Sequence, residues 1–267
     1  MKKKNKKALI IFNKEIKEVI KNKSIWLPFV IIICIFSIAL PLGFILGSDS
    51  MLEDEATLNF INKAFGEVDN PLEVLIEFIL QQLIIFLLLI PAMIPSLIAP
   101  SSILMEKENN TLEPLLATPI KTSELLLGKT LTALVPSFFI SIISFVILTV
   151  VVDITAFIKL GYTPLPTAEW VIVAFILSPI ISFIITMVSL IVSSKSTDIK
   201  SAQGIGTVVI FPIYLIIGLQ MAGFFLLNII YLLAGCVVLL AVCPLLLRLA
   251  VKIFDRENIL TRWKMKS

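Results

Sequence analysis

Residues 74–98 read VLIEFILQQLIIFLLLIPAMIPSLI, an almost unbroken apolar run in which Glu77 is the one ionisable side chain. A helix needs about 20 apolar residues to cross the ~30 Å hydrocarbon core of a bilayer, because it rises ~1.5 Å per residue. This stretch therefore predicts a membrane span. Pro91 and Pro95 lie toward its far end, and Pro100 lies just past it. Each proline removes a backbone donor, so we expect the helix to bend or unwind there.

Similar apolar runs recur along the whole chain of 267 residues, which is 58% hydrophobic. Soluble domains are roughly 45–50% apolar and seldom contain long uncharged runs. No polar segment between these runs is as long as a soluble domain. The sequence therefore predicts an all-α, polytopic membrane protein with one domain over residues 1–267. Six spans are expected, at residues 25–46, 74–98, 127–152, 170–193, 204–219 and 224–247.

Lysine and arginine are distributed unevenly between the two sides that these spans define. Of the 22 basic residues, all except Lys63 and Lys159 lie on the side of the N-terminus. Basic residues near spans are retained in the cytoplasm, so we predict that both termini are cytoplasmic. Residues 47–73, which carry seven carboxylates and one lysine, then form an acidic loop on the outer side.

Residues 1–23 carry nine lysines and two glutamates. Among them an apolar stripe recurs at helical spacing, formed by Leu9, Phe12, Ile16, Val19 and Ile20. The lysines fall on the other face of the same helix. This pattern predicts a basic amphipathic helix that lies in the membrane interface. A solvated basic tail is the alternative, and the apolar stripe argues against it.

Ionisable side chains are rare inside the expected spans. Burying an ionisable group in a membrane is costly, and these spans contain almost none. The deeper polar residues are Gln81, Gln82, Gln220 and Asn228. They fit either hydrogen bonds between helices or the lining of a transport path, and the sequence leaves both interpretations open. The chain has no histidine, which excludes His-based metal sites and His general bases.

The cytoplasmic loop before the third span is the most informative polar segment. Residues 106–129 read EKENNTLEPLLATPIKTSELLLGK. Asn110 or Thr111 can cap a short helix whose first turn holds Glu113, where the helix dipole favours a negative charge. Pro119 disfavours helical geometry at the residue before it and should end this helix.

The predicted loop helix has about two turns and one leucine face, formed by Leu112, Leu115 and Leu116 at i, i+3 and i+4. Such a short helix is not stable alone, so it either packs beneath its own spans or docks into a groove on a cytoplasmic partner. The surrounding carboxylates are Glu106, Glu108 and Glu113. Their charge suits a groove with basic rims, which favours the second interpretation.

The same loop ends in SELLLGKT, residues 123–130, and its Gly-Lys-Thr matches the end of a phosphate-binding P-loop. A P-loop reads G-x-x-x-x-G-K-[ST], and its first glycine follows a strand. Here Ser123 holds that first position, and the stretch continues directly into a membrane span. We therefore expect no nucleotide site in this chain. Instead, Gly128 allows close packing and Lys129 is expected at the cytoplasmic membrane surface, where a basic residue anchors a span.

The loop motif E-K-E-x-x-T-L-E-x-L-L-x-x-P-I, followed by E-L-L-L-G-K, resembles the loop between the second and third spans of ABC-2-type permeases. These proteins are the membrane subunits of ATP-binding-cassette exporters. The resemblance covers the whole chain, from the basic entry helix through the six spans to the basic tail. It implies a permease in the plasma membrane of a prokaryote that dimerises, with itself or with a homologous permease. It also implies two copies of a separate cytoplasmic ATPase subunit.

On this resemblance, residues 105–123 form the coupling loop that docks into the ATPase. The positions that fall in the coupling motif are Glu106, Glu108, Thr111, Leu112, Glu113, Leu115 and Leu116. Gly128 and Lys129 fall at the entry of the third span. ATP and magnesium would be bound by the partner, so this chain is expected to hold no cofactor, to be no enzyme and to bind no nucleic acid.

Relatives of this kind export sodium, drugs, peptides or lipid-linked molecules, and the sequence does not choose among these substrates. Two features depart from the family. The segment GLQMAG at residues 218–223 leaves little room for a re-entrant element between the last two spans, and the first outer loop is short.

A carrier or channel that needs no ATPase is the alternative function, and a membrane enzyme or assembly anchor is a third. The scarcity of carboxylates in the spans weighs against an ion-coupled carrier and an enzyme.

Overall fold

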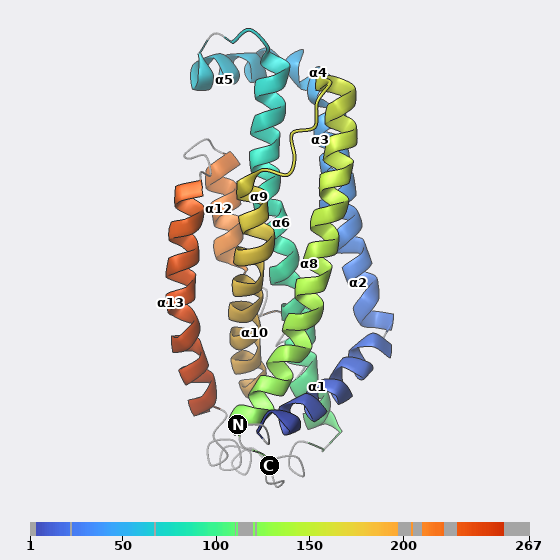
Figure 1. Cartoon of the computed structure of the whole chain (residues 1–267), viewed down its shortest axis with the longest axis vertical. Helices are drawn as coiled ribbons and strands as arrows, with labels where there is room; N and C mark the ends of the chain where they lie inside the picture. Colours follow the sequence, from blue (N-terminus) through green and yellow to red (C-terminus); the bar gives the residue numbers. More distant parts are fainter. Residues whose placement is uncertain are drawn as a thin grey trace.

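A computed structural model describes residues 4–21, 23–66, 68–109, 111, 120, 122–196, 204, 210–221 and 229–253. Within these residues every regular element is a helix, which confirms the prediction of an all-helical protein. Most of the long helices run along the longest axis of the molecule, whereas α1 at one end and α5 at the other lie across it (Figure 1).

The first part of the chain forms α1 (Lys4–Lys21), α2 (Lys23–Ile33), the π-helical segment η1 (Cys34–Ala39), α3 (Leu40–Leu46), α4 (Ser48–Leu52) and α5 (Glu55–Phe65). Two long helices follow, α6 (Pro71–Glu108) and α8 (Thr122–Leu160). The last part contains α9 (Ala168–Ile172), the π-helical segment η2 (Val173–Leu177), α10 (Ser178–Lys195), α12 (Phe211–Met221) and α13 (Ile229–Ile253).

In the described part of the chain, five helical stretches are long and apolar enough to cross a membrane, by length and composition. They are Trp26–Leu46, Pro71–Glu106, Ser123–Leu160, Ala168–Ser194 and Ile229–Ile253. Each overlaps one of the predicted spans. The remaining predicted span, residues 204–219, overlaps α12, which has 11 residues. Because residues 205–209 and 222–228 lie outside the described part, the sixth span and the break at 218–223 stay predictions.

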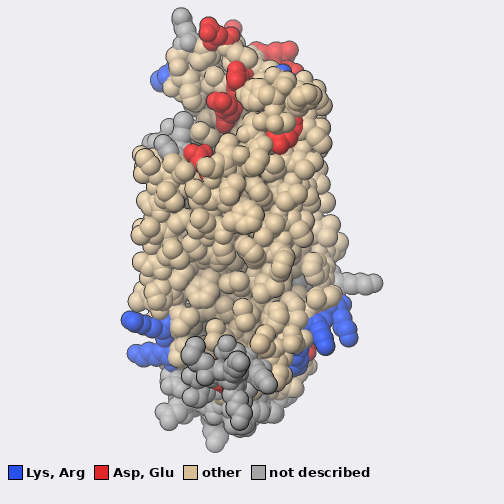
Figure 2. Space-filling model, in the orientation of Figure 1, with Lys and Arg blue, Asp and Glu red and all other residues tan. Residues whose placement is uncertain are grey.

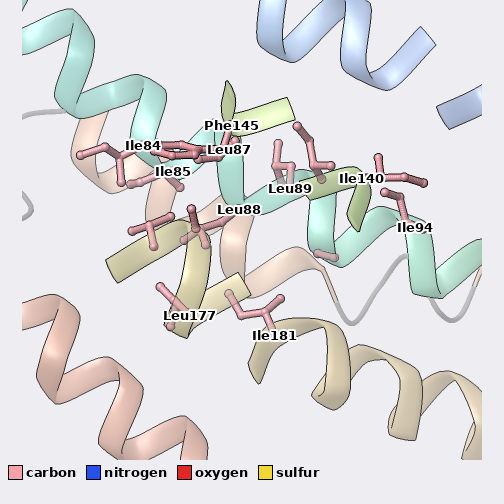
Figure 3. Packing of buried hydrophobic residues seen from close by; sticks show 14 of the residues in the cluster. Ile84, Ile85, Leu87, Leu88, Leu89, Ile94, Ile140, Phe145, Leu177 and Ile181 are labelled. Atoms are coloured by element: carbon pink, nitrogen blue, oxygen red, sulfur yellow. The ribbon is translucent and has the colours of Figure 1, made fainter. Parts of the chain in front are cut away.

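α6 is the central helix of the bundle. In an apolar stretch of 18 residues within its span, 83% is buried inside the bundle, whereas the corresponding share for α13 is 11%. α8 and α10 both pack against α6. A helix that is apolar around its whole circumference is expected to be surrounded in this way. Figure 3 shows part of the resulting core, with Ile84, Leu87, Leu88 and Ile94 of α6, Ile140 and Phe145 of α8, and Ile181 of α10.

The outward faces of the bundle are apolar. Figure 2 shows a wide belt without charged side chains, with most acidic residues at one end and most basic residues at the other. Large exposed side chains in this belt include Phe139, Ile143 and Val150 of α8 and Val237 and Leu245 of α13. This arrangement is typical of a helical bundle that is surrounded by lipid.

α6 stays helical through Pro91, Pro95 and Pro100, so of the two outcomes expected there, unwinding does not occur. Because Pro95 has no N–H, the carbonyl of Pro91 has no donor in its own helix. Two hydroxyls donate to it instead: Ser137 of α8 at 3.2 Å and Ser182 of α10 at 3.0 Å. Neighbouring helices thus restore the hydrogen bond that the proline removed, as a membrane interior requires.

Polar contacts also join the elements at the end of the bundle that holds α4 and α5. Lys159, at the end of α8, forms an ion pair with Asp49 of α4. Tyr162, in the loop that follows, donates a hydrogen bond of 2.9 Å to Glu73 in the first turn of α6. α4, α6 and α8 are therefore linked to one another at this end.

Candidate functional site

The two ends of the predicted coupling loop meet at the end of the bundle that holds α1. α6 ends at Glu108, and α8 begins at Thr122. Glu106 lies in the last turn of α6, and Lys129 lies in the second turn of α8. α1 packs against this part of α8 and crosses the base of the bundle (Figure 1).

Lys129 is the centre of a buried cluster of charges, although it was predicted to lie at the membrane surface. Lys129 is 1% exposed. Its Nζ donates to Glu15 Oε1 of α1 at 2.7 Å and to the backbone carbonyl of Ser102 in α6 at 3.0 Å. The same Nζ lies 2.9 Å from Glu106 Oε2. One ammonium group therefore links α1, α6 and α8.

This location of Lys129 differs from the prediction because α1 covers it. Gly128 makes the cover possible: a Cβ at that position would lie 2.9 Å from the Ile11 Cβ and 3.0 Å from the carbonyl oxygen of Ala8. Any larger residue would push α1 away from α8. The missing side chain of Gly128 thus lets α1 approach closely enough to bring Glu15 to Lys129.

Glu15 was absent from the residues that sequence reasoning selected. It is 5% exposed, and it shares the buried face of α1 with Ala8, Ile11 and Val19. A signal was present in the sequence, since Glu15 lies four residues after Ile11 and four before Val19, in line with an apolar face. A carboxylate in such a row needs a buried partner, because an unpaired charge is costly to bury.

The cluster holds two carboxyl groups and one ammonium group, so its charges do not balance. Burial raises the pKa of the Glu15 carboxyl above its ordinary value of 4.5, and the nearby charge of Glu106 raises it further. The charge and hydrogen bond of Lys129 act in the opposite direction without cancelling the effect of burial. Protonation of Glu15 is therefore the step that would neutralise the cluster.

The remaining residues of the predicted coupling motif are described only in part. The Thr111 N–H donates to the Glu106 carbonyl at 2.9 Å, and its hydroxyl donates to the same oxygen at 3.3 Å. Thr111 therefore closes the end of α6. The backbone of Glu108 ends that helix. The motif positions outside the described residues are Leu112, Glu113, Leu115 and Leu116, so the predicted loop helix stays a prediction.

The four polar residues predicted in the spans are described only in part. Gln81 and Gln82 lie in α6. Gln82 is 9% exposed, and its Nε2 has no hydrogen-bond partner among the described residues. Gln220 lies in α12, where its side chain is not described, and Asn228 lies outside the described residues. Both interpretations of these residues therefore stay open.

The fold defines a polytopic helical membrane protein. Its central helix, α6, leads into a loop whose two ends are joined by the cluster around Lys129. The chain belongs to the ABC-2 transporter family: a family model described as "ABC-2 family transporter protein" matches residues 9–238. It is therefore a membrane permease component of an ABC transporter, which confirms the resemblance seen in the loop motif. Neither the search of curated proteins nor the search of solved structures found a match.

Proposed function

We propose that this chain is the permease subunit of an ABC exporter, which forms its translocation path as a dimer and docks a separate ATPase at residues 105–123. The observation that carries this proposal is the buried cluster around Lys129. It joins Glu106, at the start of the loop, to the first turns of α8, where the loop ends. A force applied to the loop would act on both helices together.

The central position of α6 supports the same proposal. α6 is in contact with α8 and α10 along the membrane, and its lower part leads directly into the loop. When two ATPase subunits bind ATP and close, the loops that they hold would move with them. Because the cluster ties α1, α6 and α8 together, these helices would move as one unit and could change the side of the membrane to which the path opens.

ATP would be bound by the partner and not by this chain. In support of this, residues 123–130 lie within α8, so SELLLGKT is helical and does not form a glycine-rich loop. In addition, the Lys129 ammonium is surrounded by Glu15, Glu106 and a backbone carbonyl. A P-loop lysine must instead be available to phosphate oxygens.

The test is to purify the chain together with the ABC ATPase encoded beside it and to reconstitute both in vesicles. We expect a stable complex, ATPase activity that the permease stimulates, and ATP-dependent loss of substrate from the cytoplasmic side. Glu113→Lys should weaken the complex, because it reverses a charge on the proposed docking helix. Glu53→Lys is the matched control, since this exposed carboxylate lies at the outer end.

The proposal fails if no ATPase from the same genome forms a complex with the chain, or if Glu113→Lys and Glu53→Lys behave alike. Transport that continues without any ATPase would instead favour the carrier or channel. The substrate is best sought by screening sodium, drugs, peptides and lipid-like molecules for stimulation of the reconstituted ATPase.

The exposed basic residues support a cytoplasmic location of both termini (Figure 2).

A further inference from the structure

α1 has three different faces, and only one of them packs against the helical bundle. Ala8, Ile11, Glu15 and Val19 form the buried face, which packs against α8. Beside it, Leu9 is 49% exposed and Ile20 is 57% exposed. The described residues therefore leave about half of each of these two apolar residues uncovered. The predicted stripe is thus split, since Val19 packs against the bundle while Leu9 and Ile20 point away from it.

The third face of α1 carries a row of lysines. Lys14, Lys17 and Lys21 follow one another at i, i+3 and i+7, so they line one side of the helix. All three are exposed. Lys14 lies 3.9 Å from Glu18 in an exposed ion pair, which partly offsets its charge. Lys17 and Lys21 have no carboxylate at salt-bridge distance among the described residues.

Trp26 indicates where this row lies relative to the bilayer. It follows α1 directly, at the start of the first span, and its indole N–H donates to the Ile20 carbonyl at 3.1 Å. Tryptophan side chains concentrate at the level of the lipid headgroups. The hydrogen bond therefore holds the last turn of α1 at that level, with Lys21 beside the headgroups and Ile20 able to enter the apolar layer.

We propose that this outer face of α1 is a binding surface for anionic phospholipid headgroups, with Lys17 and Lys21 as its main contacts and Lys14 as a weaker one. A lipid surface fits both halves of the face at once. Its phosphate layer complements the lysine row, and its acyl boundary covers the exposed Leu9 and Ile20. An acidic soluble protein would match the lysines and leave the apolar half in water.

The test uses the full chain reconstituted in phosphatidylcholine vesicles, with Trp26 as the reporter. Trp170→Phe and Trp263→Phe leave Trp26 as the single tryptophan. Its fluorescence is then measured with brominated phosphatidylglycerol or brominated phosphatidylcholine as the quenching lipid. We expect phosphatidylglycerol to be preferred about 25-fold, because each of the two lysines near an anionic surface contributes about fivefold. Lys17→Gln with Lys21→Gln should reduce the preference to about one, and Lys14→Gln should reduce it less.

Two controls separate this surface from general charge effects. Arginine at positions 17 and 21 keeps the charge and should keep the preference. Lys63→Gln removes a lysine at the opposite end of the molecule and should change nothing. If the single-tryptophan background fails to fold, spin-labelled phosphatidylglycerol and phosphatidylcholine bound to the unmodified chain and its lysine variants give the same ratio. Equal quenching by both lipids, or a preference that survives Lys17→Gln with Lys21→Gln, overturns the proposal.

Discussion

At the scale of single residues, Lys129 is a buried charge with two carboxylate partners. Its ammonium group is removed from water and is satisfied by Glu15, Glu106 and the Ser102 carbonyl. An ion pair of this kind contributes little net stability compared with apolar residues of the same volume, but it is very sensitive to the loss of one partner. The cluster is therefore expected to fix the relative positions of three helices more than to stabilise the fold.

Lys129→Met should be strongly destabilising, because it leaves two carboxyl groups buried together without a cation. We expect a loss of about 3–5 kcal/mol, the cost of breaking one side of a buried pair. The measurement is the thermal unfolding midpoint of the purified chain in detergent. Lys63→Met, at an exposed position, is the control. The triple variant Lys129→Met, Glu15→Gln, Glu106→Gln should recover much of the loss, and a Lys129→Met protein as stable as the control would contradict the role of the cluster.

Glu15 makes the stability of the chain dependent on pH. Its pKa is raised in the folded protein, mainly by burial, so the folded state holds its proton more tightly than the unfolded state. The stability that protonation gives is fully present below the ordinary value of 4.5 and is lost as pH rises through the raised pKa. Relative to Glu15→Gln, the natural chain should therefore lose stability with increasing pH.

Unfolding midpoints of the two proteins over a pH series measure this dependence. Glu18→Gln, which changes an exposed carboxylate on the same helix, should give a constant difference from the natural chain. A constant difference for Glu15→Gln as well would mean that Glu15 has the same pKa in both states.

At the scale of helices, α6 depends on its neighbours to complete its backbone. The Pro91 carbonyl accepts from Ser137 and Ser182, and these two hydroxyls also lie 2.8 Å from each other. Four residues along each helix, Ser178 donates to Ser141 at 2.8 Å. The antiparallel helices α8 and α10 are thus in register through two pairs of serines, small residues that let membrane helices approach closely.

Ser137→Ala and Ser182→Ala should each have a small effect, because the other hydroxyl still donates to the Pro91 carbonyl. Both together should cost about 1–3 kcal/mol, more than the sum of the single changes, since the buried carbonyl is then left without a donor. Thermal unfolding of the four proteins gives the coupling energy. The matched control is Ser141→Ala with Ser178→Ala, which removes both partners of one bond and should be nearly neutral. Additive effects at Ser137 and Ser182 would show that the carbonyl does not need them.

At the scale of the whole molecule, charge and hydropathy are arranged in layers. Acidic side chains gather at the end that holds α4 and α5, an uncharged belt follows, and basic side chains gather at the end that holds α1 (Figure 2). With the basic end in the cytoplasm, a cysteine at position 63 should face outward and one at position 14 should face inward.

Intact cells provide the measurement of this orientation. In a background with Cys34, Cys236 and Cys243 changed to alanine, Lys63→Cys should react with a membrane-impermeant maleimide from outside. Lys14→Cys should react only after the membrane is permeabilised. The reverse pattern would place the termini outside the cell and would remove the basis for an ATPase partner at the loop.

Much of this architecture could be predicted from the sequence, because a membrane is a uniform solvent for long segments. The run at residues 74–98 is long and apolar enough to span a membrane whatever packs against it. The predicted spans overlap the apolar helices for the same reason. The scarcity of ionisable groups inside the spans was equally visible. What failed was placement beside other helices: Lys129 was assigned to the surface, and Glu15 was not selected at all.

The sequence by itself determined the helical class, the spans that the structure describes and the separation of acidic and basic ends. These properties depend on local composition, since each span is partitioned into lipid by its own side chains. Only the tertiary structure decided that Glu15, Glu106 and Lys129 form one cluster and that serines of α8 and α10 complete α6. Glu15 and Lys129 are 114 positions apart, and they meet because Gly128 lets α1 cross α8 at close range. Such a contact depends on how helices pack, which no single segment of the chain specifies.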